Sequence, residues 1–188
     1  TFYREERQRA YIHNAFDRYL APELVKRIAE DPGQLNLGGE LRDMTVLFCD
    51  VRSFSSISEK LAPNEIIQFL IRFLTPMTDI LLASEGTIDK YMGDAIMCFW
   101  NAPLDIVDHE RKACLAALRM VDSLVALNRG REKPLKVGIG LNSAPCCVGN
   151  LGSAQRFSYS AIGDGVNLAS RVEGLTKNFG QLQVLRGI

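Results

Sequence analysis

The sequence predicts an α+β fold, with an antiparallel sheet that helices cover on one face. Short apolar runs rich in strand-forming residues alternate with longer stretches whose apolar residues recur at helical spacing. Glycine and proline mark the borders between these segments. The resulting order is strand, helix pair, hairpin, helix, strands and helix, which is typical of α+β domains.

Composition indicates one domain with a substantial core, because 47% of the 188 residues are hydrophobic. The 22 basic residues balance the 22 acidic ones, so nothing predicts a nucleic-acid partner. The five cysteines lie in apolar runs and contain no C-x-x-C pair, which favours reduced, buried thiols over zinc or disulfides. No apolar run reaches the roughly 18 residues of a membrane span, and we expect a cytoplasmic domain.

The chain divides near residue 40. Residues 1–40 read as an N-terminal helical segment, because apolar residues recur at helical spacing before Pro22 and a second short helix follows it. The polar, glycine-rich stretch DPGQLNLGGE closes this segment. Residues 41–188 form the globular domain. The N-terminal helix either couples an upstream domain to the globular one or is a packing helix.

The first half of the globular domain begins with the strand Met44–Val51. A long amphipathic helix follows, with a kink or break expected near Pro76, and Gly86 ends it. Residues 87–100 read as a hairpin with its turn at MGD. In the second half we expect a helix over 108–128, strands over 135–152 broken near Ala144–Pro145, a strand over 156–164 and a helix over 165–180.

Two carboxylates stand at the ends of predicted strands. Asp50 ends the first strand and Asp94 lies in the hairpin turn, so both meet at one edge of the sheet if the strands are neighbours. Such hard oxygen ligands hold Mg²⁺, and two ions can bracket a phosphoryl centre. Gly93 would give phosphates room to approach. The same residues also fit an ordinary strand end and turn.

Two further groups of polar residues fit phosphate chemistry. Serines surround Phe54 just before a helix, where free N–H groups attract phosphate oxygens, although serine also commonly caps helices. Asn167 and Arg171 are four residues apart and share a helix face, from which they could orient a ribose and neutralise a phosphoryl group. A solvent-exposed pair is the alternative reading.

In combination, four blocks of sequence resemble the catalytic domain of the class III nucleotidyl cyclases, the adenylate/guanylate cyclase family. The blocks are VLFCDVRSFSSISEKLAPNEII, EGTIDKYMGDAIMCFW, VGIGLNSAPCCVGNLGS and RFSYSAIGDGVNLASRVEGLTK. They cover roughly residues 44–178 in the order of the family. A metal aspartate followed by K-x-x-G-D and G-D-x-V-N-x-A-S-R is a highly specific combination. The bacterial adenylate cyclase type, with its palm-type, ferredoxin-like sheet, is the most similar.

The resemblance implies a role for each matching residue. Asp50 and Asp94 would bind two divalent cations, Mg²⁺ or Mn²⁺, with the Val51 carbonyl as a further ligand. The other implied roles are base recognition by Lys90 and Ser160, ribose orientation by Asn167, transition-state stabilisation by Arg171, and triphosphate binding by Ser53, Phe54, Ser55 and, less specifically, Arg156.

The two base-reading positions favour ATP over GTP. The family's guanylate cyclases carry glutamate and cysteine there. Lys90 can donate to adenine N1, whereas guanine N1–H is itself a donor, and a buried mismatch rejects the wrong substrate. Ser160 departs from the threonine usual in the bacterial subgroup, which keeps the hydroxyl but loses the stiffening methyl group.

The implied reaction converts ATP to 3′,5′-cyclic AMP and pyrophosphate through attack of the ribose 3′-hydroxyl on the α-phosphorus, for intracellular signalling. The family builds its active sites at a dimer interface, so we expect a head-to-tail homodimer, with an upstream sensor or membrane domain possible. The family also has a further strand pair and a phosphate-binding lysine after the last helix, and we expect these to be incomplete here.

Four alternatives stay open. The chain could be a catalytically silent nucleotide-binding module that regulates a neighbour, although every chemical position that can be checked is filled. A guanylate cyclase is opposed by Lys90. A diguanylate cyclase would need a G-G-D/E-E-F block, which YMGDAI is not. A plain α+β scaffold would require the whole set of spacings to be accidental.

Overall fold

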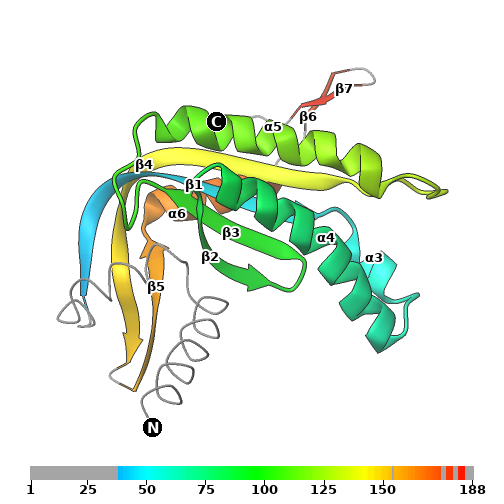
Figure 1. Cartoon of the computed structure of the whole chain (residues 1–188), viewed down its shortest axis with the longest axis horizontal. Coiled ribbons are helices and arrows are strands. Elements are labelled where there is room, and N and C mark those ends of the chain that lie inside the picture. Colours follow the sequence, from blue (N-terminus) through cyan, green and yellow to red (C-terminus); the bar gives the residue numbers. More distant parts are fainter. Residues whose placement is uncertain (1–37, 154, 175–176, 180–181, 185–188) are drawn as a thin grey trace, which may run out of the picture.

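A computed structural model describes residues 38–153, 155–174, 177–179 and 182–184. Its main feature is a five-stranded antiparallel sheet with the strand order β2-β3-β1-β4-β5 (Figure 1). The strands are β1 (Gly38–Val51), β2 (Thr87–Met92), β3 (Ala95–Trp100), β4 (Val137–Ser153) and β5 (Arg156–Ile162). The helices are α3 (Phe54–Ser58), α4 (Pro63–Ala83), α5 (His109–Leu127) and α6 (Asp164–Gly174). The predicted α+β class with an antiparallel sheet is confirmed.

Alternate residues of β1 face two different cores. Leu47, Cys49 and Val51 are buried against α4 and α5 on one face of the sheet. Met44 and Val46 are buried on the other face, where α6 packs. We expected all helices on one face, but α6 lies on the opposite side from α4 and α5 (Figure 1). The unbroken apolar run of β1 reflects this arrangement, because a strand covered on both faces does not alternate with polar residues.

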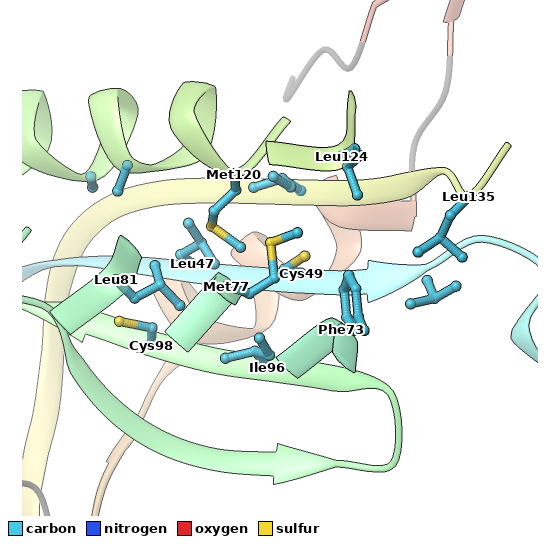
Figure 2. Close-up of a cluster of buried hydrophobic side chains, with 14 of the residues drawn as sticks. Leu47, Cys49, Phe73, Met77, Leu81, Ile96, Cys98, Met120, Leu124 and Leu135 are labelled. Carbon is cyan, nitrogen blue, oxygen red and sulfur yellow. The ribbon is translucent and has the colours of Figure 1, made fainter. Parts of the chain in front are cut away.

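The larger core lies between the sheet and the pair α4 and α5. Figure 2 shows side chains from α4, α5 and the strands β1 and β3 converging on one layer. In α4, the residues Phe69, Phe73, Met77 and Leu81 recur at helical spacing and are buried there. Burying each such side chain contributes about 1.5–3 kcal/mol, so this layer is the main source of stability on that face.

Two glycines of β4 let α6 approach the sheet closely. A Cβ at Gly140 would collide with the backbone of Ala169 and Glu173 in α6. A Cβ at Gly138 would collide with the side chains of Arg52 and Glu173. The G-x-G spacing places both glycines on one face of β4, because side chains of a strand alternate. The α6 helix, which carries Asn167 and Arg171, is therefore fixed closely against the end of β4.

Two predicted interruptions are absent. The α4 helix continues through Pro76, with Phe73 and Met77 on either side of it buried in the core. The β4 strand continues through Pro145, which pairs with Asp43 of β1. On its other edge β4 pairs with β5 only from Cys147 onward, so the missing N–H of Pro145 leaves no ladder bond unmade there.

The two ends of the chain bear on the predicted domain division. The N-terminal helical segment, predicted over residues 1–40, falls almost entirely outside the described residues, and β1 already begins at Gly38. After α6, the short strands β6 (Lys177–Phe179) and β7 (Leu182–Val184) form a separate two-stranded sheet. Each of these strands has three residues, and β6 occupies the end of the stretch that we predicted as a helix over residues 165–180, so that helix is shorter than predicted.

By length and composition, α4 is the one described helix that meets the requirements of a membrane span. The sequence predicted α4 as a long amphipathic helix, and its apolar run is interrupted by Arg72 and Asp79. Its buried stripe packs on the sheet in the layer that Figure 2 shows. Amphipathic core helices of this kind pass the same test of length and composition.

Candidate active site

The two predicted metal-binding carboxylates meet where β1 ends. The pairing of β1 with β3 brings Cys49 opposite Ile96, so Asp50 lies beside the turn that connects β2 to β3. Asp94 is in that turn, and its Oδ2 accepts a hydrogen bond of 3.2 Å from the backbone N–H of Val51. The three residues predicted as metal ligands therefore lie close together, as we expected if the first strand and the hairpin were neighbours in the sheet.

Electrostatics at this pair favour a cation. Burial, a hydrogen bond with Asp50 and the negative charge of Asp50 together raise the pKa of the Asp94 carboxyl to about 7, with burial as the largest cause. The Val51 N–H opposes this shift. Two carboxylates placed side by side repel each other when both are ionised, and a divalent cation between them removes that cost.

Gly93 has a conformational role in the turn. Met92 pairs with Ala95, which leaves Gly93 and Asp94 as a two-residue hairpin loop. Gly93 has a φ of 67°, which favours glycine, and the loop resembles a turn with glycine at its first central position. A Cβ there would meet no described atom within 4 Å. The positive φ of this turn is therefore enough to explain why a glycine occupies position 93.

A second polar cluster lies where the two edge strands of the sheet meet. The Lys90 ammonium on β2 donates a hydrogen bond of 3.0 Å to Ser160 Oγ on β5, although the residues are 70 positions apart in sequence. Ser160 Oγ in turn donates a bond of 2.7 Å to Asp89 Oδ2. These two edge strands are hydrogen-bonded neighbours of β3 and β4 respectively, not of each other. The curled sheet thus assembles the predicted base-reading pair in one chain.

Asp89 is a site residue to which the sequence reading gave no role. Its side chain is 1% exposed, and its Oδ1 lies 3.2 Å from the Lys90 ammonium. In the register of β2 with β3, Ile88 pairs with Cys98 and Lys90 with Met97, so Asp89 is the extra residue of a β-bulge. A bulge re-aims side chains and is frequent beside active sites. The feature of the sequence that could have identified Asp89 as a site residue is a carboxylate inside an otherwise apolar hairpin.

Asn167 and Arg171 lie on the outer face of α6. The buried residues of this helix are Gly165, Val166, Ala169 and Val172, whereas Asn167 and Arg171 are exposed. Across the described part of the chain, no hydrogen bond or ion pair connects them with the Asp50–Asp94 pair or with Lys90 and Ser160. One chain by itself therefore leaves these two side chains exposed to solvent.

The predicted phosphate loop lies at the start of α3. The Phe54 ring lies at a tilt against the Phe69 ring, with ring centroids 5.8 Å apart, and packs against the core, so it anchors the loop. Ser53 has a left-handed φ of 59° and makes no side-chain cap to α3. Ser55 is exposed, and its carbonyl accepts a bond of 3.0 Å from the Ser58 hydroxyl. Ser53 and Ser55 are exposed and Phe54 is half-buried, so the side chains of both serines are accessible to a ligand.

Arg156 lies at the hairpin between β4 and β5, where it begins β5 and pairs with Ser153. This hairpin is at the opposite end of the molecule from α3 (Figure 1). Within one chain, Arg156 is therefore not near the Asp50–Asp94 pair.

An ion pair between Arg52 and Glu173 connects the carboxylate pair to α6. Arg52 follows Val51 directly, and its Nη1 lies 3.0 Å from Glu173 Oε1, while its Nη2 donates to the Glu173 carbonyl. Burial raises the pKa of the Glu173 carboxyl, Arg52 opposes that shift, and the negative charge of Asp50 adds to it. Sequence gave no signal for this pair, because the two residues are 121 positions apart.

Residues 39–185 match the family model described as the adenylate and guanylate cyclase catalytic domain. The chain belongs to this family. The match covers every described strand of the five-stranded sheet and every predicted site residue, so the cyclase domain contains both polar clusters.

Individual relatives carry both substrate names. The cyclase domain is 35% identical over 173 residues to the adenylate cyclase of Anabaena cylindrica, which is 90% of this chain and 33% of that protein. It is 34% identical to the solved adenylyl cyclase CyaB from P. aeruginosa, with a TM-score of 0.69 over 73% of this chain and 74% of that one. The guanylyl cyclase Cya2 is also 34% identical, with a TM-score of 0.67 and coverage of 73% and 72%.

Overall similarity therefore does not separate the two substrates. The chain also spans only a third or less of the length of each of three curated relatives that it matches.

The residues present fit a pair of divalent cations bound together with a nucleotide. No group of three or more His, Cys, Asp and Glu side chains comes together within the described residues. Mg²⁺ is commonly held by one or two carboxylates, with substrate phosphates and water completing its shell. The adjacent carboxylates of Asp50 and Asp94, with the pKa of Asp94 raised, match that kind of site.

Proposed function

We propose that the cyclase domain converts ATP to 3′,5′-cyclic AMP and pyrophosphate. The observation that carries this proposal is the hydrogen bond between Lys90 and Ser160 at the junction of β2 and β5. The lysine can donate to adenine N1, and the same position would oppose the N1–H of guanine. The lysine is 45% exposed, so its ammonium is accessible to a base.

Asp50, Asp94 and the Val51 carbonyl would hold the cations, Mg²⁺ or Mn²⁺. When bound, such cations lower the pKa of the attacking ribose 3′-hydroxyl and neutralise charge on the phosphates. The exposed serines before and within α3, Ser53 and Ser55, would contact the triphosphate. No side chain needs to act as a general base in this scheme.

The side chains of α6 would act on the ribose and the α-phosphoryl group. Arg171 would stabilise the negative charge that develops on the α-phosphoryl oxygens as the 3′-oxygen attacks and pyrophosphate leaves. Asn167, one turn earlier on the same exposed face, would orient the ribose. Arg156 would approach the β-phosphate only if a second chain brings the β4–β5 hairpin to the site.

The outward direction of Asn167 and Arg171 supports a head-to-tail homodimer. Each of two equivalent sites would take its carboxylates from one chain and its α6 side chains, with Lys90 and Ser160, from the other. We place this dimer in the cytoplasm as the signalling output of a longer protein, with the N-terminal segment of residues 1–40 coupling it to a sensor or membrane domain.

The test is product formation from ATP and from GTP, each with Mg²⁺ and with Mn²⁺, at high protein concentration. Asp50→Ala should abolish product, with a loss of about a hundredfold or more. Asp122→Ala is the matched control, because it removes an exposed aspartate of α5. Cyclic GMP formed from GTP in excess of cyclic AMP formed from ATP would favour a guanylate cyclase. Nucleotide binding without any product would favour a silent regulatory module.

A further inference from the structure

We propose that Asp89 is a positioning residue that fixes the hydrogen-bond polarity of Ser160, so that this position only accepts hydrogen bonds from the base. The inference deepens the proposed function and rests on it. It explains why a buried carboxylate occupies the middle of an apolar hairpin, where the sequence reading found no role.

Burial and contacts make Asp89 an anchor for the base-reading pair. Its side chain is 1% exposed, and Oδ2 accepts bonds from Ser160 Oγ at 2.7 Å and from the Ala161 N–H at 3.2 Å. Its Oδ1 lies 3.2 Å from the Lys90 ammonium and makes no hydrogen bond elsewhere in the described chain. A buried carboxylate needs such partners, and each of them is thereby held in place.

The direction of each hydrogen bond follows from the chemistry of the partners. An ammonium group has donors only, so Ser160 Oγ must accept from Lys90. An ionised carboxylate has acceptors only, so the single proton of the Ser160 hydroxyl must point to Asp89. What Ser160 can still offer to a ligand is its second lone pair, which is an acceptor.

This polarity matches adenine and opposes guanine. Adenine presents the N1 acceptor beside the 6-amino donor, whereas guanine presents the N1–H donor beside the O6 acceptor. Lys90 has N–H groups beyond the one given to Ser160, and one of them can donate to N1. Ser160 can accept from the 6-amino group. With guanine, the N1–H donor would face the Lys90 donor, and the O6 acceptor would face the lone pair of Ser160. Both contacts would therefore be mismatched.

The β-bulge makes the arrangement possible. In a regular strand, Asp89 and Lys90 would point to opposite faces of the sheet. The extra residue at Asp89 shifts the register, and both side chains reach the same hydroxyl. The bulge therefore places the Asp89 carboxylate and the Lys90 ammonium that neutralises it on the same side of β2, next to β5.

The test compares Asp89→Leu with Asp89→Asn, both in the full chain. Leucine has nearly the shape of aspartate but no acceptor, so the Ser160 proton becomes free to donate to guanine O6. We expect the ratio of kcat/KM for ATP to that for GTP to fall at least about tenfold. Asparagine keeps one acceptor oxygen, and we expect it to retain most of the ratio.

A double-mutant cycle separates positioning from a structural role. If Asp89 acts through the hydroxyl, Ser160→Ala should lower the ratio and Asp89→Leu should lower it little further in that background. A merely structural role would reduce both substrates alike and leave the ratio unchanged. An unchanged ratio in a folded Asp89→Leu variant would overturn the inference.

Two controls keep the inference falsifiable. Competition of ATP and GTP against a fluorescent ATP analogue measures preference without turnover, so an inactive wild type would count against the cyclase proposal while the polarity test proceeds. Circular dichroism melts show which variants fold. If Asp89→Leu and Asp89→Asn both fail to fold, Ser160→Thr should keep the preference and Ser160→Ala should lose it, and equal preference in both would overturn the inference.

Discussion

The backbone N–H of Val51 lies 3.2 Å from Asp94 Oδ2, and this hydrogen bond ties the end of β1 to the turn of the β2–β3 hairpin. It holds the Asp94 carboxylate beside Asp50, at the point where the sheet offers two negative charges and no described cationic side chain of its own between them.

Asp94→Asn should change how stability depends on pH. The folded protein raises the pKa of Asp94 from 3.8 to about 7, mainly by burial, so it holds this proton more tightly than the unfolded chain. The resulting stabilisation is complete below about pH 3.8 and is lost as the pH rises through about 7. Without divalent cations, the variant should therefore gain in melting temperature relative to wild type between pH 4 and 7. A difference that stays constant over this range would contradict the assignment.

Divalent cations should bind more tightly as the pH rises toward 7. A proton on Asp94 competes with the cation, and the pKa of about 7 sets where that competition ends. Calorimetric titration with Mn²⁺ at pH 5.5 and pH 8 should show about a tenfold or larger increase in affinity, with protons released at the lower pH. Asp94→Asn should bind weakly at both values. Equal wild-type affinity at both would contradict this prediction.

Two inactive variants should restore activity when they are mixed. Asp50→Ala and Arg171→Ala each disable both sites of their own homodimer, if each site draws on two chains. In a mixed dimer, one site receives intact Asp50 from one chain and intact Arg171 from the other. An equal mixture should recover about a quarter of wild-type activity, because about half of the dimers are mixed and each has one intact site.

The control for this mixing experiment pairs Asp50→Ala with Asp94→Ala. Both lesions then fall in the same half of the site, so no mixed dimer contains an intact site. Recovery in that control, or no recovery with Arg171→Ala, would count against shared sites.

Gly138→Ala should destabilise the domain by about 1–3 kcal/mol, the usual cost of inserting an atom into a packed interior. The new methyl would collide with the Arg52 and Glu173 side chains, which form the ion pair between β1 and α6. Gly174→Ala is the matched control, because a Cβ there meets no described atom within 4 Å. Urea unfolding of both variants measures the difference in their free energies of unfolding. Equal midpoints would contradict the prediction, because they would mean that the Arg52 and Glu173 side chains move aside without loss of stability.

The cysteines should differ sharply in reactivity toward a thiol reagent. Burial raises the pKa of the Cys49 and Cys98 thiols far above the usual range, which disfavours the reactive thiolate. Cys114 is exposed on α5, contrary to the expectation that every cysteine is buried. Under native conditions Cys114 should be modified first and Cys49 and Cys98 last, as mass mapping would show. Early modification of Cys49 would mean that the core opens readily.

Local patterns in the sequence predicted much of the fold. The apolar run of β1 and the helical stripe of α4 are where their spacing placed them, because burial of an apolar face selects for that spacing. The apolar stripe expected for α5 was wrong, because Leu118, Val121 and Val125 are exposed, and smaller residues such as Ala113 and Ala116 face the core instead. The turn at Gly93 and Asp94 followed from the glycine. The side of the sheet on which α6 packs did not follow, since it depends on Gly138 and Gly140 of another strand.

For the site, the sequence by itself determined the chemical types: two carboxylates at strand ends, a lysine and a serine predicted to read a base, and an Asn–Arg pair on one helix face. Only the tertiary structure decided which of these meet in one chain. It joined Lys90 to Ser160 across the two edges of a curled sheet, and it gave Asp89 its place through a one-residue bulge. Strand register and sheet curvature arise from contacts between residues far apart in sequence, and no local pattern encodes them.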